Sequence, residues 1–453
     1  MARLWLRPAV VAFVMACVPR VWAWWYFPSP EPNNQYWLSE SLLTTGALAF
    51  GDDPASFVEP IYPAFLAILR ATAGSERLAL LIQALVAATG GAAICRLTAR
   101  ISGSSTAGLC AAAFYAFDPY FVRQSTSYIA VPLQLPLVLW ALDRLVAARR
   151  AASAAVAGGL FGLVFLLRAS LLPVCLGALA LLAVRRLWRQ ALVAAVVMVA
   201  IVLPWSIRSH RAGNGVFPTT LGQYLYLSTS IHAVGVVPIY DIGLLMRFAH
   251  FRLDEALGEP RSVHSEGLAD RILARRALEF AVTHPVETVA LKLQNLLWIP
   301  APILLPRNAT SEYTHAAMID GRMQLTGVER RPWTWEVLHT SFRSIVLFAA
   351  IAGLRRRREF DDAILLIVLI SETIVHTVLF PTTRLLVVFE AVVMVYAGIG
   401  ARGFRTRHVN SQPSNSLGAS FEVARDRSTP NLQLPTPKAR GSKELGESRT
   451  RQL

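Results

Sequence analysis

Runs of about twenty apolar residues alternate with short polar connections along most of this chain. A helix of about 20 residues crosses the ~30 Å hydrocarbon core of a bilayer, so each run predicts one membrane-spanning helix. Ten runs fit this description, and eleven or twelve spans are the alternatives. The predicted spans lie near residues 8–27, 78–97, 103–121, 126–146, 151–167, 169–184, 189–207, 338–354, 361–380 and 384–401. This pattern predicts an all-α fold class, a polytopic transmembrane helical bundle of about 10–12 spans.

The first run begins after two basic residues, Arg3 and Arg7, as a secretory signal peptide does. A signal peptide has a shorter apolar core and a cleavage site between small residues. This run instead continues into the aromatic segment 22–26, which is typical of an interfacial belt at the far side of a membrane. We therefore predict an uncleaved first span.

Basic residues recur in every second connection between the spans. Short loops that are rich in Arg stay in the cytoplasm, so these clusters orient the chain with its N-terminus inside. Loops 28–77 and 208–337 then lie on the opposite, non-cytoplasmic face. The clusters are Arg96 and Arg100; Arg144, Arg149 and Arg150; Arg185, Arg186 and Arg189; and Arg355 to Arg358.

One further apolar run, 286–305, lies within the second outer loop. As a full span it would place Arg355 to Arg358 outside, against the positive-inside pattern. Pro300, Pro302 and Pro306 also interrupt its end. We therefore predict a helix that lies against the bilayer or enters it partway, as one of several non-cytoplasmic loop helices.

Composition excludes a soluble globular protein and sets one domain boundary. Of the 453 residues, 54% are hydrophobic and only 16% are charged, and the mean hydropathy is +0.44. We predict a transmembrane domain over 1–401 and a disordered, basic cytoplasmic tail over 402–453, which has few large apolar residues to bury. The net charge of +15 reflects the cytoplasmic arginines and this tail, so we predict no nucleic-acid partner.

The motifs of soluble enzymes are absent from the sequence. The four cysteines, Cys17, Cys95, Cys110 and Cys175, all lie in predicted spans without CxxC spacing, and we interpret them as small apolar side chains. The sequence has no Gly-rich phosphate loop, nucleophile elbow or HExxH motif. We predict no metal ligands and no certain cofactor. Dependence on a divalent metal stays open, because the acidic residues of the first outer loop define no ligand geometry.

A series of short polar motifs lies on the predicted non-cytoplasmic face. A loop rich in acidic and aromatic residues directly after the first span adds nothing to stability, so it indicates chemistry at the bilayer surface. We therefore expect the active site on this face. In chain order the motifs are Glu31-Pro32-Asn33-Asn34-Gln35-Tyr36-Trp37, Glu59-Pro60-Ile61-Tyr62-Pro63, Leu167-Arg168, Leu203-Pro204-Trp205-Ser206-Ile207-Arg208, His284-Pro285 and the segment from His376 to Arg384.

The order and placement of these motifs resemble the GT-C fold membrane glycosyltransferases, in particular the bacterial glycosyltransferase 39-like group related to protein mannosyltransferases and aminoarabinose transferases. The resemblance covers about residues 1–402. It implies a multi-pass protein of the bacterial inner (plasma) membrane that acts in the cell envelope. It also implies transfer of a hexose or pentose from a polyprenyl-phosphate donor to a lipid, glycan or protein acceptor on the outer face.

Such a transfer needs a carboxylate near the membrane surface that takes the proton of the acceptor hydroxyl. The family carries an acid, usually Asp, a few positions before the first-loop tyrosine, where this chain has the amides of segment 33–35. Amides cannot act as bases at neutral pH. The candidate catalytic residues are therefore Glu31, which is the nearest acid, and as alternatives Glu59, Asp52 and Asp53. Loss of the family chemistry and a base at some other residue are the remaining alternatives.

The leaving group is a lipid phosphate whose negative charge grows in the transition state, so arginines are expected at headgroup depth. Each arginine also has a structural alternative, because its side chain could reach lipid headgroups from a helix end. His376 could equally hold a helix by hydrogen bonding, and Tyr62 could shape the loop helix. The resemblance assigns substrate binding to Tyr36, Tyr62, Arg168, Arg208, His376 and Arg384.

Two other function classes remain. A transporter needs alternating access around a midplane site and usually has internal repeats, which this sequence does not show. A non-catalytic binding or scaffold protein of the same fold is favoured by Asn33 and Asn34, which stand where the family has its acid. Membrane lipids are expected partners in every case.

Overall fold

The structure is a computed structural model that describes residues 2–50, 53–54, 59–148, 150–211, 215, 220–230, 233, 266–304, 314–319, 322–328, 333–356 and 361–409. The predicted tail beyond Val409 lies outside the described residues.

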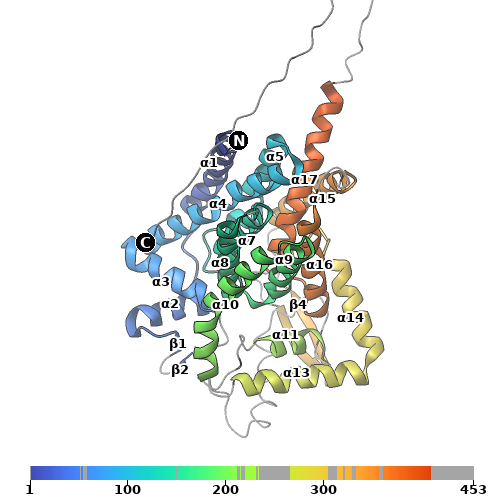
Figure 1. Ribbon diagram of the computed structural model, residues 1–453. Helices are drawn as coiled ribbons and strands as arrows, with labels where there is room; N and C mark the ends of the chain where they lie inside the picture. The colour runs from blue at the N-terminus through green and yellow to red at the C-terminus, as the bar shows by residue number, and fades with distance from the viewer. Residues whose placement is uncertain are drawn as a thin grey trace, which may run out of the picture. The chain divides into compact units, whose positions relative to one another are not determined.

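Ten helices occupy the positions of the ten predicted spans, which confirms the all-α helical bundle (Figure 1). Within the described residues, four helices are long and apolar enough to cross a membrane by length and composition alone: α1 from Arg7, α4, α10 and α15. These apolar helices are those of an integral membrane protein. The ten are α1 (Ala2–Tyr26), α4 (Glu76–Ser102), α5 (Ser105–Phe117), α7 (Val131–Val146), α8 (Ala151–Leu167), α9 (Leu172–Val184), α10 (Trp188–Arg211), α15 (Trp333–Leu354), α16 (Ala363–Val378) and α17 (Val387–Val409).

Several of the other apolar helices are shorter than a full span because the chain breaks them. Asp118 follows the end of α5 and begins the short helix α6 (Pro119–Gln124), where its carboxylate accepts a hydrogen bond from the Phe121 N–H at 2.8 Å. Arg168 ends α8, and a single 3₁₀ turn, η1 (Ala169–Leu171), leads into α9. The predicted spans are therefore pairs of helices in places, with the buried Asp118 at one break and the half-buried Arg168 at the other.

The two predicted outer loops contain the remaining elements. Helices α2 (Asn34–Thr45) and α3 (Ile61–Ala73) lie in the first loop, and α14 begins at Pro285 and ends at Trp298, close to the predicted loop helix. The described parts of these loops also contain two antiparallel strand pairs, which were not predicted from the sequence. The other elements are β1 (Ala49–Phe50), β2 (Asp53–Pro54), α11 (Leu221–Ser228), α13 (Glu266–Thr283), β3 (Thr314–Ile319) and β4 (Arg322–Val328).

Small residues let the long helices approach closely. A Cβ atom added to Gly400 of α17 would lie 2.0 Å from the carbonyl oxygen of Ala349 in α15, and one added to Gly353 would lie 2.0 Å from that of Tyr396. In a bilayer, van der Waals contact between such backbones replaces the hydrophobic effect as the force that holds helices together. The contact between α15 and α17 therefore depends on these two glycines.

Ion pairs with buried carboxylates join two pairs of helices, α4 with α7 and α15 with α17. The fully buried carboxylate of Asp143 in α7 pairs with Arg100 at 2.6 Å and with Arg96 at 3.4 Å. These two arginines, which the sequence analysis used only for orientation, therefore also hold α4 against α7. Nearer the start of α17, Arg343 pairs with Glu390 at 3.0 Å and joins α15 to α17.

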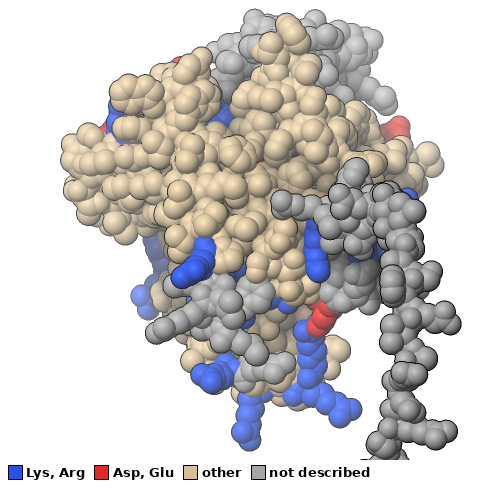
Figure 2. Space-filling model, turned by 90° about the horizontal axis from the view of Figure 1, so that it is seen from above, with Lys and Arg blue, Asp and Glu red and all other residues tan. Residues whose placement is uncertain are grey.

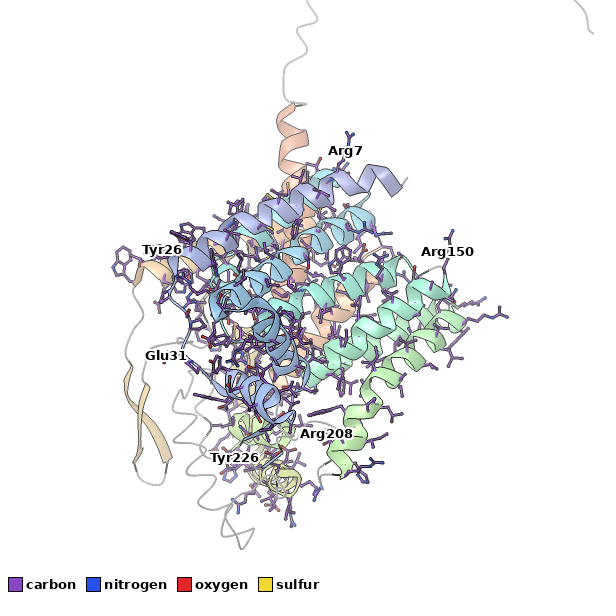
Figure 3. The ribbon with its side chains drawn as sticks, turned by 90° about the vertical axis from the view of Figure 1, so that its left-hand side faces the viewer. Arg7, Tyr26, Glu31, Arg150, Arg208 and Tyr226 are labelled. Carbon is purple, nitrogen blue, oxygen red and sulfur yellow. The ribbon has the colours of Figure 1, made fainter. Side chains whose placement is uncertain are left out.

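Figure 3 labels three arginines on which the predicted orientation can be followed. Figure 3 places Arg7 and Arg150, which lie near the starts of α1 and α8, at one end of the bundle, and Tyr26 and Arg208 away from that end. Figure 2 looks at the end that is uppermost in Figure 1, where Lys and Arg side chains stand out and Asp and Glu are scarcely visible. Which side of the membrane this end faces stays a prediction.

We expect Gly400→Ala to destabilise the bundle, because the new methyl group must push the backbone of α15 away. Overpacking of this kind costs about 1–3 kcal/mol. The matched control is Gly159→Ala in α8, where the added Cβ would meet only side-chain atoms at 3.5 Å or more. Thermal denaturation of the purified variants in detergent should show a lower midpoint for Gly400→Ala alone; equal midpoints would contradict the close contact.

Candidate active site

Glu59 lies at the entrance to α3, and the buried Tyr62 fixes that entrance. The Tyr62 hydroxyl donates to the side-chain oxygen of Gln83 at 2.9 Å and lies 3.3 Å from the carbonyl oxygen of Ser127. These contacts attach the start of α3 to α4 and to the turn before α7. Tyr62 is only 1% exposed. Its position therefore fits the structural alternative, in which it shapes the loop helix and places Glu59.

Arg168 lies at the break between α8 and α9. Its backbone N–H completes α8 by donating to the carbonyl of Val164 at 2.8 Å. Its side chain donates from Nε to the hydroxyl of Ser170 at 3.0 Å and from Nη1 to the carbonyl oxygen of Arg384 at 3.2 Å. The next backbone N–H, that of Ala169, lies 3.4 Å from Oε1 of Glu59. The break therefore brings three distant parts of the sequence together.

Arg384 lies in the short connection between α16 and α17. The turn is fixed by Thr382, whose hydroxyl accepts a hydrogen bond from the Leu385 N–H at 3.1 Å. Arg384 itself is exposed, and its carbonyl is held by Arg168. We call Glu59, Arg168 and Arg384 the Glu59 cluster.

The three residues of the Glu59 cluster are one acid and two arginines. Glu59 is half-buried, and desolvation raises its pKa above the ordinary range, whereas the nearby charges of Arg168 and Arg384 act in the opposite direction. Among the described residues, neither arginine has a carboxylate within the 4.0 Å of an ion pair. Two guanidinium groups near one carboxylate suit an anion, and the carboxylate suits a proton acceptor beside it.

Two residues at the cluster were not selected from the sequence. Tyr224 of α11 packs its ring on Phe380, with 5.6 Å between ring centroids, and interacts electrostatically with Glu59 and both arginines. Glu372 of α16 is 1% exposed and interacts with Arg168. A lone acid inside an apolar run is a signal that could have selected Glu372. No pattern in the sequence distinguishes Tyr224 from other loop aromatics.

His376 is buried below the cluster. Its Nε2 lies 3.4 Å from Oε2 of Glu372, one turn earlier in α16, and its Nδ1 lies 3.3 Å from the carbonyl oxygen of Phe380. Both ring nitrogens therefore lie near oxygen atoms of the protein. This arrangement fits the structural alternative, in which His376 holds the end of α16, and its role in substrate binding stays a prediction.

Tyr36 belongs to a separate polar cluster between α2, α3 and α4. Its hydroxyl contacts Glu76, its ring lies 4.1 Å from the guanidinium of Arg70, and Arg70 pairs with Glu40 at 2.5 Å. Glu31 precedes this cluster and is exposed on the loop after α1 (Figure 3). Neither residue is in contact with the Glu59 cluster within the described part of the chain.

Asn33 has a structural role at the position where the family acid is expected. Its side-chain oxygen accepts hydrogen bonds from the N–H groups of Gln35 and Tyr36 at the start of α2, and its Nδ2 donates to the carbonyl of Tyr128 at 2.9 Å. A carboxylate could make the first contacts but not the last, because it has no donor. The amide therefore holds α2 against the turn before α7.

The remaining candidates lie apart from the cluster or outside the described residues. Arg208 stacks over Trp205 at 4.6 Å and donates to the carbonyl of Leu48 at 3.2 Å. Asp52 lies outside the described residues, and of Asp53 only the backbone, in β2, is described. The described residues contain no group of three or more His, Cys, Asp or Glu side chains that could hold a metal ion.

No family model and no curated protein matches this chain. Among solved structures, the archaeal oligosaccharyltransferase AglB from Archaeoglobus fulgidus, in complex with an inhibitory peptide and a dolichol-phosphate, is similar with a TM-score of 0.52 over 93% of this chain. This chain has a GT-C fold. The match has 18% sequence identity and covers 53% of the archaeal protein, so this chain spans about half its length. At this identity the likeness establishes the fold alone.

Two further structures are similar at lower scores. The apo form of an Archaeoglobus fulgidus oligosaccharyltransferase gives a TM-score of 0.49 at 17% identity, over 93% of this chain and 53% of that one. ArnT from Cupriavidus metallidurans in the apo state gives 0.35 at 15% identity, over 88% of this chain and 78% of that one. Scores below 0.5 add nothing to the fold assignment.

We expect Asn33→Asp to weaken the attachment of α2, because the new carboxylate faces the Tyr128 carbonyl without a proton to donate. Loss of such a hydrogen bond costs about 1 kcal/mol, and repulsion adds to it. The matched control is Asn34→Asp, an exposed position in the first turn of α2 where a negative charge is favourable. Thermal denaturation should show a lower midpoint for Asn33→Asp only, and a midpoint as high as that of Asn34→Asp would refute this role.

Proposed function

We propose that this protein is an integral membrane glycosyltransferase. It transfers a sugar from a polyprenyl-phosphate-linked donor to a lipid, glycan or protein acceptor at the outer face of a bacterial inner membrane. The observation that carries the proposal is the Glu59 cluster, in which one half-buried carboxylate lies near two arginines that have no carboxylate partner among the described residues. The GT-C fold supports it, because the similar archaeal oligosaccharyltransferase was solved with a dolichol-phosphate.

Glu59 is the general base of the proposed reaction. Its carboxylate takes the proton of the acceptor hydroxyl as the hydroxyl oxygen attacks the anomeric carbon of the donor sugar. The bond between that carbon and the phosphate oxygen breaks, and its electron pair leaves with the lipid phosphate. Glu59 then releases the proton to water, so atoms and charges balance over one turnover.

Arg384 and Arg168 receive the charge that develops on the leaving phosphate. Arg384 is exposed at the cluster, so its guanidinium can meet a headgroup phosphate directly. Arg168 is held by Ser170 and by the Arg384 carbonyl, which keeps the second positive charge in place. A preorganised cation stabilises a developing anion most strongly where water is partly excluded.

Geometry supports Glu59 as the base in preference to Glu31. Glu59 lies with Arg168 and Arg384, whereas Glu31 is exposed on a proline-rich loop and has no described contact with either arginine. In this proposal the catalytic acid is therefore supplied by the second half of the first outer loop, later in the chain than the position where the family has its acid. Asn33, which occupies that position, has its hydrogen-bonding groups committed to α2 and to Tyr128.

A non-catalytic binding protein is the second candidate, and the structural use of Asn33 favours it. Such a protein would hold a polyprenyl-phosphate sugar at the same arginines without turning it over. Purified protein in lipid vesicles with a panel of radiolabelled polyprenyl-phosphate sugars separates the two: product indicates the enzyme, and saturable binding without product indicates the scaffold.

Glu59→Gln should lower the rate of transfer by about 10²–10⁴-fold, while Glu31→Gln keeps most of the activity, because Glu59, unlike Glu31, lies near the two arginines of the proposed donor site. Donor binding should survive in both variants. Since desolvation raises the pKa of Glu59, its base form is lost at a higher pH than for an ordinary Glu. The rate of the native protein should therefore fall with decreasing pH above the usual range for a carboxylate. Loss of activity in Glu31→Gln with a fully active Glu59→Gln would reverse the assignment.

Arg384→Ala should lower the rate of transfer by about 10²–10³-fold, because removing one preorganised donor costs on the order of 2–4 kcal/mol of transition-state stabilisation. The matched control is Arg355→Ala. Arg355 is an exposed arginine directly after the C-terminal end of α15. Steady-state kinetics at equal expression would test this, and an equal loss in both variants would argue against contact between Arg384 and the donor.

A further inference from the structure

Helix α14 carries a continuous exposed apolar row. Its members recur at spacings of three and four residues, which places them on one side of the helix. Val286 is 80% exposed and Leu297 is 75% exposed, so the protein leaves this side uncovered over the whole helix. The row consists of Val282 at the end of α13 and Val286, Val289, Leu293 and Leu297 of α14.

The other sides of α14 identify lipid as what covers this row. Glu287 is exposed and Gln294 is half-buried, and they lie seven residues apart on a different side from the apolar row. A helix with one apolar and one polar exposed side lies at a lipid–water boundary and does not cross the bilayer. Helix α16, which contacts α14, also exposes apolar residues: Ile370, Ile374 and Val378. In Figure 1, α14 rises beside α16.

On a third side of α14, two polar side chains donate hydrogen bonds to the end of α16. The ammonium of Lys292 donates to the carbonyl of Val378 at 2.6 Å, and the amide of Asn295 donates to the carbonyls of Thr377 and Leu379, each at 3.2 Å. The last carbonyls of a helix have no partner within the helix, and a cation there is favoured by the helix dipole. Desolvation lowers the pKa of Lys292 to about 8, so the group stays mostly charged at pH 7.

Lys292 also holds the end of α11. Its ammonium donates to the hydroxyl of Thr229 at 2.6 Å and to the carbonyl and hydroxyl oxygens of Ser228 at 3.1 Å. Helix α11 carries Tyr224, whose ring packs on Phe380 just beyond α16. One lysine therefore joins α14 to the two segments that bring Tyr224 and Arg384 to the Glu59 cluster.

We propose that α14 is a lipid-docked strut: its apolar row inserts into the bilayer surface, and Lys292 and Asn295 transfer that position to the chain segment that carries Arg384. Lys292 and Asn295 are positioning residues, because they act through the ends of α16 and α11. The depth of α14 in the lipid thereby sets the position of Arg384 relative to the membrane surface, where the donor phosphate would bind. The consequence for catalysis rests on the proposed function, whereas lipid docking and the link to α16 do not.

Fluorescence quenching tests the docking. Single cysteines at Val289 or Gln294, in the full chain with its four native cysteines replaced, carry a bimane label in vesicles that contain nitroxide-labelled phosphatidylcholine. The label at Val289 should be strongly quenched and the label at Gln294 only weakly. Equal quenching at both positions would overturn the contact of the apolar row with lipid.

Spin-label distances test the strut. Labels at Gln294 and Leu385 should give a narrow distance distribution in the otherwise native chain and a broad one in Lys292→Met, whereas Arg275→Met, which removes an exposed ion pair with Glu279, should change nothing. An unchanged distribution in Lys292→Met would overturn the link.

Kinetics separate the strut from the proposed function. If the chain is active, Lys292→Met should raise the donor KM about tenfold, which corresponds to loss of one good contact, with little change in kcat. An unchanged KM in an active enzyme would overturn the positioning role. If the native chain has no transferase activity, the proposed function fails, while the quenching and distance measurements still decide the strut.

Discussion

The placement of two arginines near Glu59 is the constraint on which the candidate site depends. Two guanidinium groups approach one half-buried carboxylate, and the described residues place no carboxylate within ion-pair distance of either. Like charges in a partly dry environment repel each other more strongly than in water, so a partner of negative charge stabilises them. A lipid phosphate at the membrane surface is such a partner, and its charge grows as a leaving group departs.

The helical bundle creates this constraint by breaking its helices at one end. Arg168 lies where α8 ends, Arg384 lies between α16 and α17, and Glu59 lies at the entrance to α3. Charged side chains are costly within the hydrocarbon region, so they gather where helices end. The supporting contacts are buried and specific: Tyr62 holds α3 on Gln83, and Arg343 pairs with Glu390 near the start of α17. Elements that border the site are thus held by contacts within the packed bundle.

The sequence predicted the bundle well, because length and apolarity alone decide where a helix can lie in a bilayer. The ten spans and the loop helix near 286–305 are found as helices. The sequence could not decide between Glu31 and Glu59 as the proposed base. The two acids differ in whether they lie near Arg168 and Arg384 in space, and these arginines lie more than 100 residues further along the chain. The second role of Arg96 and Arg100, as partners of Asp143, was also hidden, because positive-inside patterns look the same with or without an ion pair.

A structure of the protein in a lipid nanodisc with bound polyprenyl phosphate tests the central claim most directly. The account predicts the phosphate within hydrogen-bond distance of the Arg384 guanidinium, with Arg168 next to it and the Glu59 carboxylate facing the same space. A phosphate bound beside Arg208, or a Glu31 carboxylate facing the phosphate in place of Glu59, would contradict it.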